Sequence, residues 1–126
     1  MPGYTRVNLK EVEDSARKFG MPEELEARFA AGDLGVGVSL QRLAPNFRLP
    51  FGHRHERQEE LYVVLNGSGR IKLDDEIMEL RQWDAVRVPP DVARGIESGS
   101  EGIEVLAVNA APPARDTEQL QGWWGD

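Results

Sequence analysis

Short segments in which apolar and polar residues alternate occupy the middle of the chain, residues 34–109. Val36, Val38 and Leu40 show the pattern, because side chains two positions apart lie on the same face of a β-strand. Turn-forming sequences such as Pro89-Pro90-Asp91 separate the segments. The predicted strands cover residues 36–40, 51–56, 60–65, 71–73, 77–80, 85–88, 94–97 and 103–108. Many short strands at close spacing predict an antiparallel β-sandwich or β-barrel.

Three turn sequences set the expected ends of these strands. Asn66-Gly67-Ser68-Gly69 is typical of a hairpin turn and is expected to end the strand 60–65. Asp74-Asp75 predicts a second turn, and Ser98-Gly99-Ser100 predicts a break further along the chain. The pattern therefore predicts separate short strands rather than a few long ones.

The N-terminal arm, residues 1–33, shows helical signals instead. Asn8 can cap a helix that Gly20 can end. Pro22, followed by two glutamates, indicates the start of a second helix. Residues 25–30 also alternate as a strand would, which leaves that stretch undecided between helix and strand.

The strand 60–65 carries apolar residues on both of its faces. Leu61 and Val63 lie on one face, and Tyr62 and Val64 lie on the other. Both faces are therefore expected to be covered. The interior of a barrel covers one face, and the N-terminal arm or a second subunit must cover the other.

The C-terminal tail, residues 110–126, ends in Trp123-Trp124. Two free indole rings would leave much apolar area in water, so they are expected to dock on their own barrel or on a partner. Together with the two-faced strand, the tail predicts a homodimer. The organisation we expect is one domain, with the arm 1–33, a barrel over 34–109 and this tail.

Length, charge and composition narrow the classes of function. The 126 residues suit one domain with its own core. A net charge of −7 opposes binding to the phosphates of a nucleic acid. No apolar run approaches the roughly 18 residues of a membrane span, and the N-terminus lacks a secretory pattern. The chain has no cysteine, which excludes disulfides and thiolate zinc sites. We expect a cytoplasmic protein that binds neither nucleic acid nor membrane.

Two histidines carry the clearest chemical signal. His53 and His55 stand two positions apart in a predicted strand, so both imidazoles project to the same face. Glu59 and Glu60 follow after a short turn and can return a carboxylate to the same place. Two imidazoles and one carboxylate form a set of ligands that binds divalent transition metals. Polar groups next to apolar strands also need such a partner, because their burial is otherwise costly.

The segment that contains the histidines resembles the first motif of the cupins. His53, His55, Glu60 and Gly67 match the order His-x-His, three or four residues, Glu, six residues and Gly. The six-residue gap selects Glu60 as the family carboxylate, with Glu59 as a substitute. The resemblance implies an all-β fold, an antiparallel double-stranded β-helix or jelly-roll-like cupin barrel, here with a short helical N-terminal arm.

A later segment resembles the second cupin motif and extends the resemblance over residues 36–109. Pro89 is kept, but Trp83 and Arg94 stand where the family usually has glycine and histidine. In metal-binding cupins that histidine is usually the fourth protein ligand. Because a positive φ is costly for tryptophan, we expect a different turn at Trp83 and a partly exposed ring.

Arg94 changes what the resemblance implies about a metal. A guanidinium stays protonated and cannot ligate. A unit charge about 5 Å from a dication, at an effective dielectric near 20, is repelled by roughly 6–7 kcal/mol. Three arrangements avoid this repulsion: Arg94 turns away, an anionic ligand sits between the two cations, or no metal binds and Arg94 neutralises Glu60.

Two functions from different classes follow. In the first, His53, His55 and Glu60 hold a divalent metal (Fe, Mn, Ni or Zn), and Arg94 grips an anionic small molecule for metal-dependent oxygenase or isomerase chemistry. In the second, the protein is a metal-free, non-enzymatic ligand-binding or regulatory cupin that uses Arg94 as its anion anchor. The sequence assigns no catalytic residue and leaves the presence of a metal open.

Three more residues are expected to line the ligand site with Arg94. Tyr62 shares a strand face with Glu60 and can donate a hydrogen bond, although packing in the barrel wall is the simpler role. Phe51 flanks the histidine strand. Arg42 continues the face of Leu40 and either caps the barrel or extends into solvent.

Overall fold

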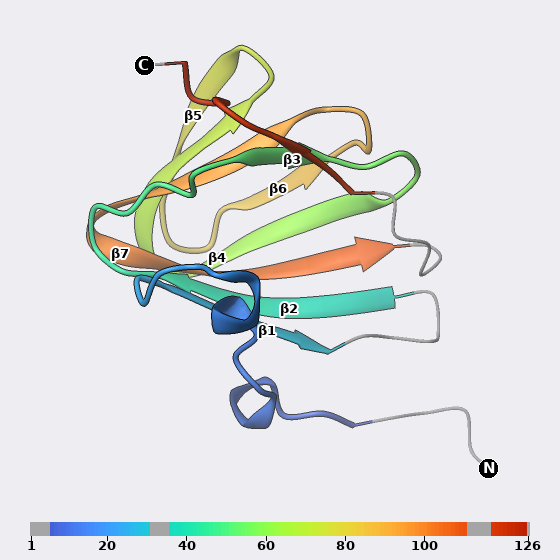
Figure 1. Ribbon diagram of the computed structural model, residues 1–126, viewed down its shortest axis with the longest axis vertical. Helices are drawn as coiled ribbons and strands as arrows, with labels where there is room; N and C mark the ends of the chain where they lie inside the picture. Colours follow the sequence, from blue (N-terminus) through green and yellow to red (C-terminus); the bar gives the residue numbers. More distant parts are fainter. Residues whose placement is uncertain (1–5, 31–35, 111–116, 126) are drawn as a thin grey trace.

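The computed structural model describes residues 6–30, 36–110 and 117–125, and it is built almost entirely of antiparallel strands (Figure 1). Two short 3₁₀ helices precede them, η1 (Leu9–Glu11) and η2 (Ala16–Phe19). The strands are β1 (Leu25–Ala30), β2 (Val36–Leu43), β3 (Gly52–Arg54), β4 (Glu59–Leu73), β5 (Glu76–Leu80), β6 (Ala85–Val88), β7 (Arg94–Ala110) and β8 (Glu118–Leu120).

The long strands β4 and β7 organise the sheet. They pair with each other over nearly their whole lengths, from Glu59 opposite Ala110 to Leu73 opposite Arg94. One path of neighbours runs β1-β2-β7-β3-β8, while β4 also pairs with β5 and β6. The sheet curls around a common interior, as Figure 1 shows. This is the antiparallel, double-stranded β-helix barrel that the sequence predicts.

The prediction of a hairpin turn at residues 66–69 is wrong, because β4 continues through it. The register with β7 shifts between Val64 and Asn66 and again between Gly67 and Gly69, so the strand bends by bulges instead of turning back. Gly67 has a φ of 76°, and a methyl group there would collide with the carbonyl oxygen of Gly102. Glycine is therefore needed here because it lets the backbones of β4 and β7 approach each other closely.

The expected break at residues 98–100 is also replaced by continuous strand. β7 runs unbroken through it, and the Cβ of any residue at Gly69 would collide with the carbonyl oxygen of Glu97. The bend of β7 lies at Gly102, which has a φ of 78°. Asp74-Asp75, by contrast, forms the expected turn between β4 and β5, where Asp74 has a φ of 52°.

The N-terminal arm is helical only in two short pieces. The Asn8 side chain accepts a hydrogen bond from the backbone of Lys10 and caps η1, and Gly20 ends η2 in the left-handed conformation with a φ of 73°. The second predicted helix does not form, because residues 25–30 are strand β1, paired with β2. Neither 3₁₀ helix could cross a bilayer, and the described ranges contain no longer helix.

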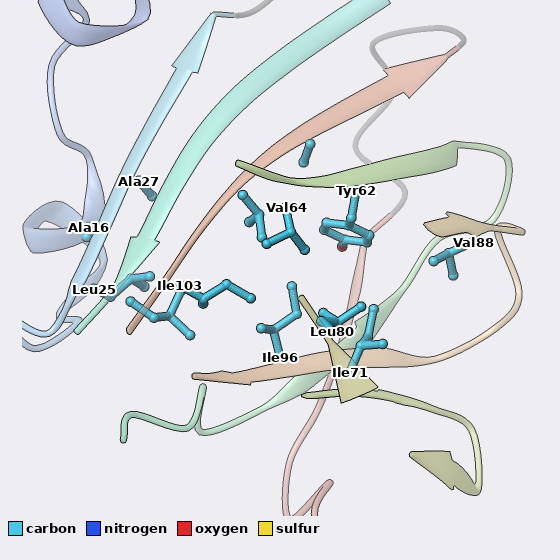
Figure 2. Packing of buried hydrophobic residues seen from close by; sticks show 13 residues of the cluster. Ala16, Leu25, Ala27, Tyr62, Val64, Ile71, Leu80, Val88, Ile96 and Ile103 are labelled. Atoms are coloured by element: carbon cyan, nitrogen blue, oxygen red, sulfur yellow. The ribbon is translucent and has the colours of Figure 1, made fainter. Parts of the chain in front are cut away.

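The apolar core lies between the two halves of the curled sheet. Figure 2 shows Tyr62 and Val64 of β4 pointing toward Ile71, Leu80 and Ile96. The opposite face of β4 and its neighbours is covered only in part. Residues 6–11 of the arm lie over this outer face and border a groove of about 690 Å³ that Leu40, Leu65 and Leu106 also line. Further along, Val36 is 59% exposed and Leu61 is 37% exposed.

Trp83 keeps the backbone conformation of a turn glycine, which corrects the expectation of a different turn. Its φ is 74°, and its backbone N–H donates to the carbonyl of Val64 at 2.7 Å, which ties the turn between β5 and β6 to β4. The ring is 69% exposed, as expected. A left-handed tryptophan stores about 1 kcal/mol or more of strain.

Replacing Trp83 with glycine is expected to raise the free energy of unfolding by about 1 kcal/mol. Glycine adopts the positive φ without strain, and the exposed ring contributes little burial. Urea unfolding of wild type, Trp83→Gly and Trp83→Ala measures the difference. Alanine keeps a Cβ and is the matched control, so an equal gain in both variants would mean that removal of the ring, not relief of strain, stabilises the protein.

Candidate metal centre

Three side chains with metal-ligating atoms converge inside one end of the barrel. His53 lies in β3, His55 follows that strand, and Glu60 lies near the start of β4. One ligand atom from each residue lies within 4.8 Å of those of the other two. The imidazole rings stand edge to face, with centroids 5.1 Å apart. The sequence prediction of a His₂-Glu group is therefore met by the geometry.

Strand pairing explains this convergence. His53 pairs with Arg94 of β7, and Glu60 pairs with Asn109 of β7 and with Val88 of β6. Partners across an antiparallel pair lie on the same face, so these side chains share the inner side of the sheet. The backbone N–H of His55 donates to the carbonyl of Pro90 at 2.8 Å, which holds the chain after β3 close to the β6–β7 connection.

Glu60, rather than Glu59, is the carboxylate of the group. The Glu60 side chain is 8% exposed and lies 3.4 Å from His53 Nε2 and 3.6 Å from His55 Nε2, both measured to Oε1. Glu59 is exposed, and its carboxylate pairs with Arg87 at 2.6 Å. The strand period explains the difference, because adjacent residues of β4 point to opposite faces.

Glu60 is also the centre of a hydrogen-bond network. The hydroxyl of Tyr62 donates to Oε1 at 2.5 Å, and the amide of Asn109 donates to Oε2 at 3.0 Å. Burial alone would raise the pKa of the Glu60 carboxyl. Hydrogen bonds from His53, His55 and Tyr62, together with the positive charge of His53, outweigh burial and hold this pKa well below its usual range. Glu60 is therefore an ionised carboxylate at neutral pH.

Tyr62 serves this network rather than an open pocket. It is buried in the core, and burial together with the nearby charge of Glu60 raises the pKa of its phenol well above the usual value. The phenol therefore stays protonated and donates to Glu60. This placement matches the simpler of its two expected roles, packing in the barrel wall.

Arg94 points inward and contacts Glu60, the third of the arrangements considered above. Its side chain has 0% exposure, Nη1 lies 3.4 Å from Glu60 Oε1, and Nη2 donates to the carbonyl of Pro89 at 2.7 Å. The third nitrogen, Nε, is buried without a hydrogen-bond partner. The guanidinium thus neutralises Glu60 from behind and presents no atom to solvent.

The remaining predicted site residues are not part of the cluster. Arg42 pairs with Glu26 at 2.8 Å, and half of its side chain is exposed on the face that continues from Leu40. Phe51 is half-buried directly before β3. Phe47, from the same connection, packs against the apolar core. The structure therefore brings together His53, His55, Glu60, Tyr62 and Arg94.

Two functional contacts were not anticipated from the sequence. Asn109 binds Glu60, and the hydroxyl of Thr117 lies 3.2 Å from Nδ1 of His55. Asn109 could have been found from the alternation of β7, because Val105 and Ala107 face inward four and two positions before it. The sequence around Thr117 gives no sign of this contact, which forms because β8 pairs with β3.

The donor set fits a divalent transition metal. Two imidazoles and an ionised carboxylate are nitrogen and oxygen ligands that Fe(II), Mn(II), Ni(II) and Zn(II) accept. Side-chain exposure is 25% for His53 but only 5% for His55, so solvent reaches the cluster mainly at His53. Arg94 cannot ligate, which leaves three protein ligands and open coordination positions for a small molecule.

Comparison with known proteins agrees with this fold and motif. The family model of the cupin domain matches residues 39–109. An uncharacterized protein of Methanocaldococcus jannaschii is 34% identical over 90 residues, 69% of this chain and 72% of that protein. A cupin protein from Bacteroides fragilis superimposes with a TM-score of 0.66 at 25% identity, covering 92% of this chain and 91% of that one. Oxalate decarboxylase from Bacillus subtilis shares the fold with a TM-score of 0.77 at 20% identity, covering 94% of this chain and 32% of that one.

The family assignment depends on the sequence match and on the geometry together. The matched region spans β3, β4, β5 and β6 with most of β2 and β7, and it contains His53, His55, Glu60 and Arg94. The barrel and the motif spacing are those expected from the sequence. This chain therefore belongs to the cupin family.

Proposed function

We propose that this protein binds an anionic small molecule at a divalent metal ion held by His53, His55 and Glu60. The observation that carries the proposal is the convergence of these three side chains, whose ligand atoms lie within 4.8 Å of one another. A bound metal would supply a Lewis acid and open positions for the ligand. In its more specific form, the proposal is that the protein catalyses an oxygenase or isomerase reaction on that ligand.

Charge supports an anionic ligand. Without a metal, the charge of the Glu60 carboxylate is already compensated by the Arg94 guanidinium, 3.4 Å away. A dication adds two positive charges to this enclosed space, where charge is weakly screened. An anionic ligand at the open positions would compensate them, which is the second arrangement considered from the sequence. The name of one fold neighbour, oxalate decarboxylase, describes an enzyme that acts on a small anion.

The residues of the cluster and their neighbours would have different roles in this site. His53, the most exposed of the three ligands, borders the side from which a ligand approaches. Tyr62 and Asn109 bind the two oxygens of Glu60 and fix the orientation of its carboxylate. Arg94 pairs with Glu60 and is the permanent positive charge beside this ligand. Such partners of a ligand commonly tune its affinity for metal.

A metal-free, non-enzymatic ligand-binding or regulatory cupin is the alternative. One observation favours it: Arg94 already compensates the charge of Glu60, so this carboxylate does not need a metal as its counter-charge. In this case Arg94 is the anion anchor, and a ligand must draw its guanidinium away from Glu60.

Metal content separates the two functions. Protein purified without a tag or chelator is expected to carry about one transition-metal ion per chain by plasma mass spectrometry. His53→Gln and His55→Gln are expected to weaken metal binding by about a hundredfold or more. Glu59→Gln is the matched control, because Glu59 adjoins Glu60 but pairs with Arg87. A wild type that stays metal-free after incubation with Fe(II), Mn(II), Ni(II) and Zn(II) would favour the alternative.

The homodimer and the cytoplasmic location stay predictions. A partly exposed apolar surface supports the homodimer prediction. Leu61 pairs with Val108, which also pairs with Val38, so apolar side chains cross three adjacent strands on the outer face. Beyond the arm, this face is exposed at Val36 and Leu61.

A further inference from the structure

The C-terminal segment, residues 117–124, runs along the strand that carries the histidines. Strand β8 pairs with β3 residue for residue, with His53 opposite Gln119 and Arg54 opposite Glu118. Figure 1 shows the dark red end of the chain lying beside β3. Because β3 pairs with β7 only through His53 and Arg94, β8 supplies most of the backbone pairing of this short strand.

Two tryptophans fasten this segment to the barrel. The Trp123 ring packs so closely on Gly52 and Gly95 that a side chain at Gly52 would overlap it. Lys72 Nζ lies 4.4 Å from the centre of that ring and donates to the Trp123 carbonyl at 2.6 Å. Trp124 Nε1 donates to the carbonyl of Leu49 at 2.8 Å. The segment is therefore held in one position along β3.

Thr117, at the start of this segment, reaches the candidate metal centre. Its hydroxyl lies 3.2 Å from Nδ1 of His55, while Nε2 of the same ring lies 3.6 Å from Glu60 Oε1. The Thr117 contact at Nδ1 therefore favours the rotation of the ring in which Nε2 faces Glu60. A ligand that binds metal through Nε2 carries its proton on Nδ1, and the Thr117 oxygen can accept that proton's hydrogen bond.

We infer that Thr117 is a positioning residue of the metal centre, and that the C-terminal segment exists in part to deliver it. This inference rests on the proposed function, because it assigns the orientation of a proposed metal ligand to a residue more than fifty positions away. A hydroxyl suits this role in either state of the site. It can accept from a protonated Nδ1 when Nε2 binds metal, or donate to Nδ1 when the proton lies on Nε2.

Removing only the hydroxyl tests the inference on the full-length chain. Thr117→Val keeps the shape of the side chain, and Thr117→Ser restores the hydroxyl. Thr117→Val is expected to weaken Zn²⁺ binding about tenfold in competition with a chromophoric chelator, and Thr117→Ser to recover most of it. Glu118→Gln is the matched control on β8, because Glu118 is adjacent to Thr117 but lies opposite Arg54 and bonds its guanidinium on the other face of the strand.

A second measurement does not depend on metal. Long-range ¹H–¹⁵N NMR of the metal-free protein is expected to show the Nδ1 resonance of His55 displaced in Thr117→Val and restored in Thr117→Ser, with His53 unchanged. If Zn²⁺ affinity and this resonance are both unaffected, the inference is overturned. If the wild type binds no metal but the resonance moves, the proposed function fails while the positioning of His55 by Thr117 stands.

Discussion

Replacing Arg94 with methionine is expected to lower the free energy of unfolding of the metal-free protein by about 3 kcal/mol or more. The Arg94 side chain is fully enclosed, and its guanidinium is the permanent cation beside Glu60, 3.4 Å away. Methionine fills a similar space but leaves an ionised carboxylate in the core without that charge. Removing one partner of a buried pair costs much more than the pair itself contributes.

Urea unfolding in the presence of a chelator measures this loss. Arg42→Met is the matched control, because Arg42 forms its ion pair with Glu26 at the surface and should cost about 1 kcal/mol or less. Under the proposed function, excess Zn²⁺ should restore much of the stability of Arg94→Met, since the dication takes over the neutralisation of Glu60. Equal losses in the two variants would show that Arg94 is not the cation on which Glu60 depends.

Replacing Arg94 with histidine is expected to raise the affinity for Zn²⁺ by about a thousandfold or more. Arg94 Nη1 lies 3.4 Å from Glu60 Oε1, so a metal bound to this carboxylate would lie about 5 Å from the guanidinium. At that separation the repulsion amounts to several kcal/mol even when an effective dielectric near 20 applies, and each 1.4 kcal/mol is about a factor of ten. Histidine removes the charge and offers the fourth ligand usual in metal-binding cupins.

Two further variants separate charge from ligation in this experiment. Arg94→Gln removes the charge without adding an imidazole, and Arg94→Lys keeps a positive charge. Chelator competition should rank Zn²⁺ affinity as histidine above glutamine above lysine. If Arg94→His binds no more tightly than Arg94→Gln, the side chain at position 94 does not reach the metal, and the first arrangement, with Arg94 turned away from it, would gain support.

The sequence was most informative about the cluster and the fold class. His53, His55 and Glu60 were predictable because strand alternation and motif spacing determine which side chains share a face. The six-residue gap of the cupin motif separated Glu60 from Glu59, which the structure pairs with Arg87. The inward direction of Arg94 was not settled by the sequence, since it depends on the pairing of Arg94 with His53.

The predictions of turns were wrong where a glycine is needed for close packing of two strands and not for a turn. Gly67 and Gly69 resemble hairpin residues, but they are required because the backbones of β4 and β7 approach too closely for any Cβ. That approach is a tertiary event, invisible in a local pattern. Trp83 shows the converse, since the local rule excludes a positive φ that the bond from its N–H to Val64 nevertheless stabilises.

The contacts of Asn109 and Thr117 depend on pairing between strands that are far apart in the sequence. Asn109 reaches Glu60 through the register of β4 with β7, and Thr117 reaches His55 through the pairing of β8 with β3. Neither residue has a distinctive neighbour in the sequence. Residues that orient ligands are therefore harder to predict than the ligands themselves.

The long pairing of β4 with β7 has a consequence for the order of folding events. Leu73 pairs with Arg94, whereas Glu60 pairs with Asn109, so the loop that must close lengthens steadily along the pair. Because the entropic cost of closure rises with loop length, pairing should start beside Leu73 and proceed toward Glu60. The end that carries Glu60 is then completed late, after the transition state. A bound metal would consequently slow unfolding and leave the rate of folding nearly unchanged.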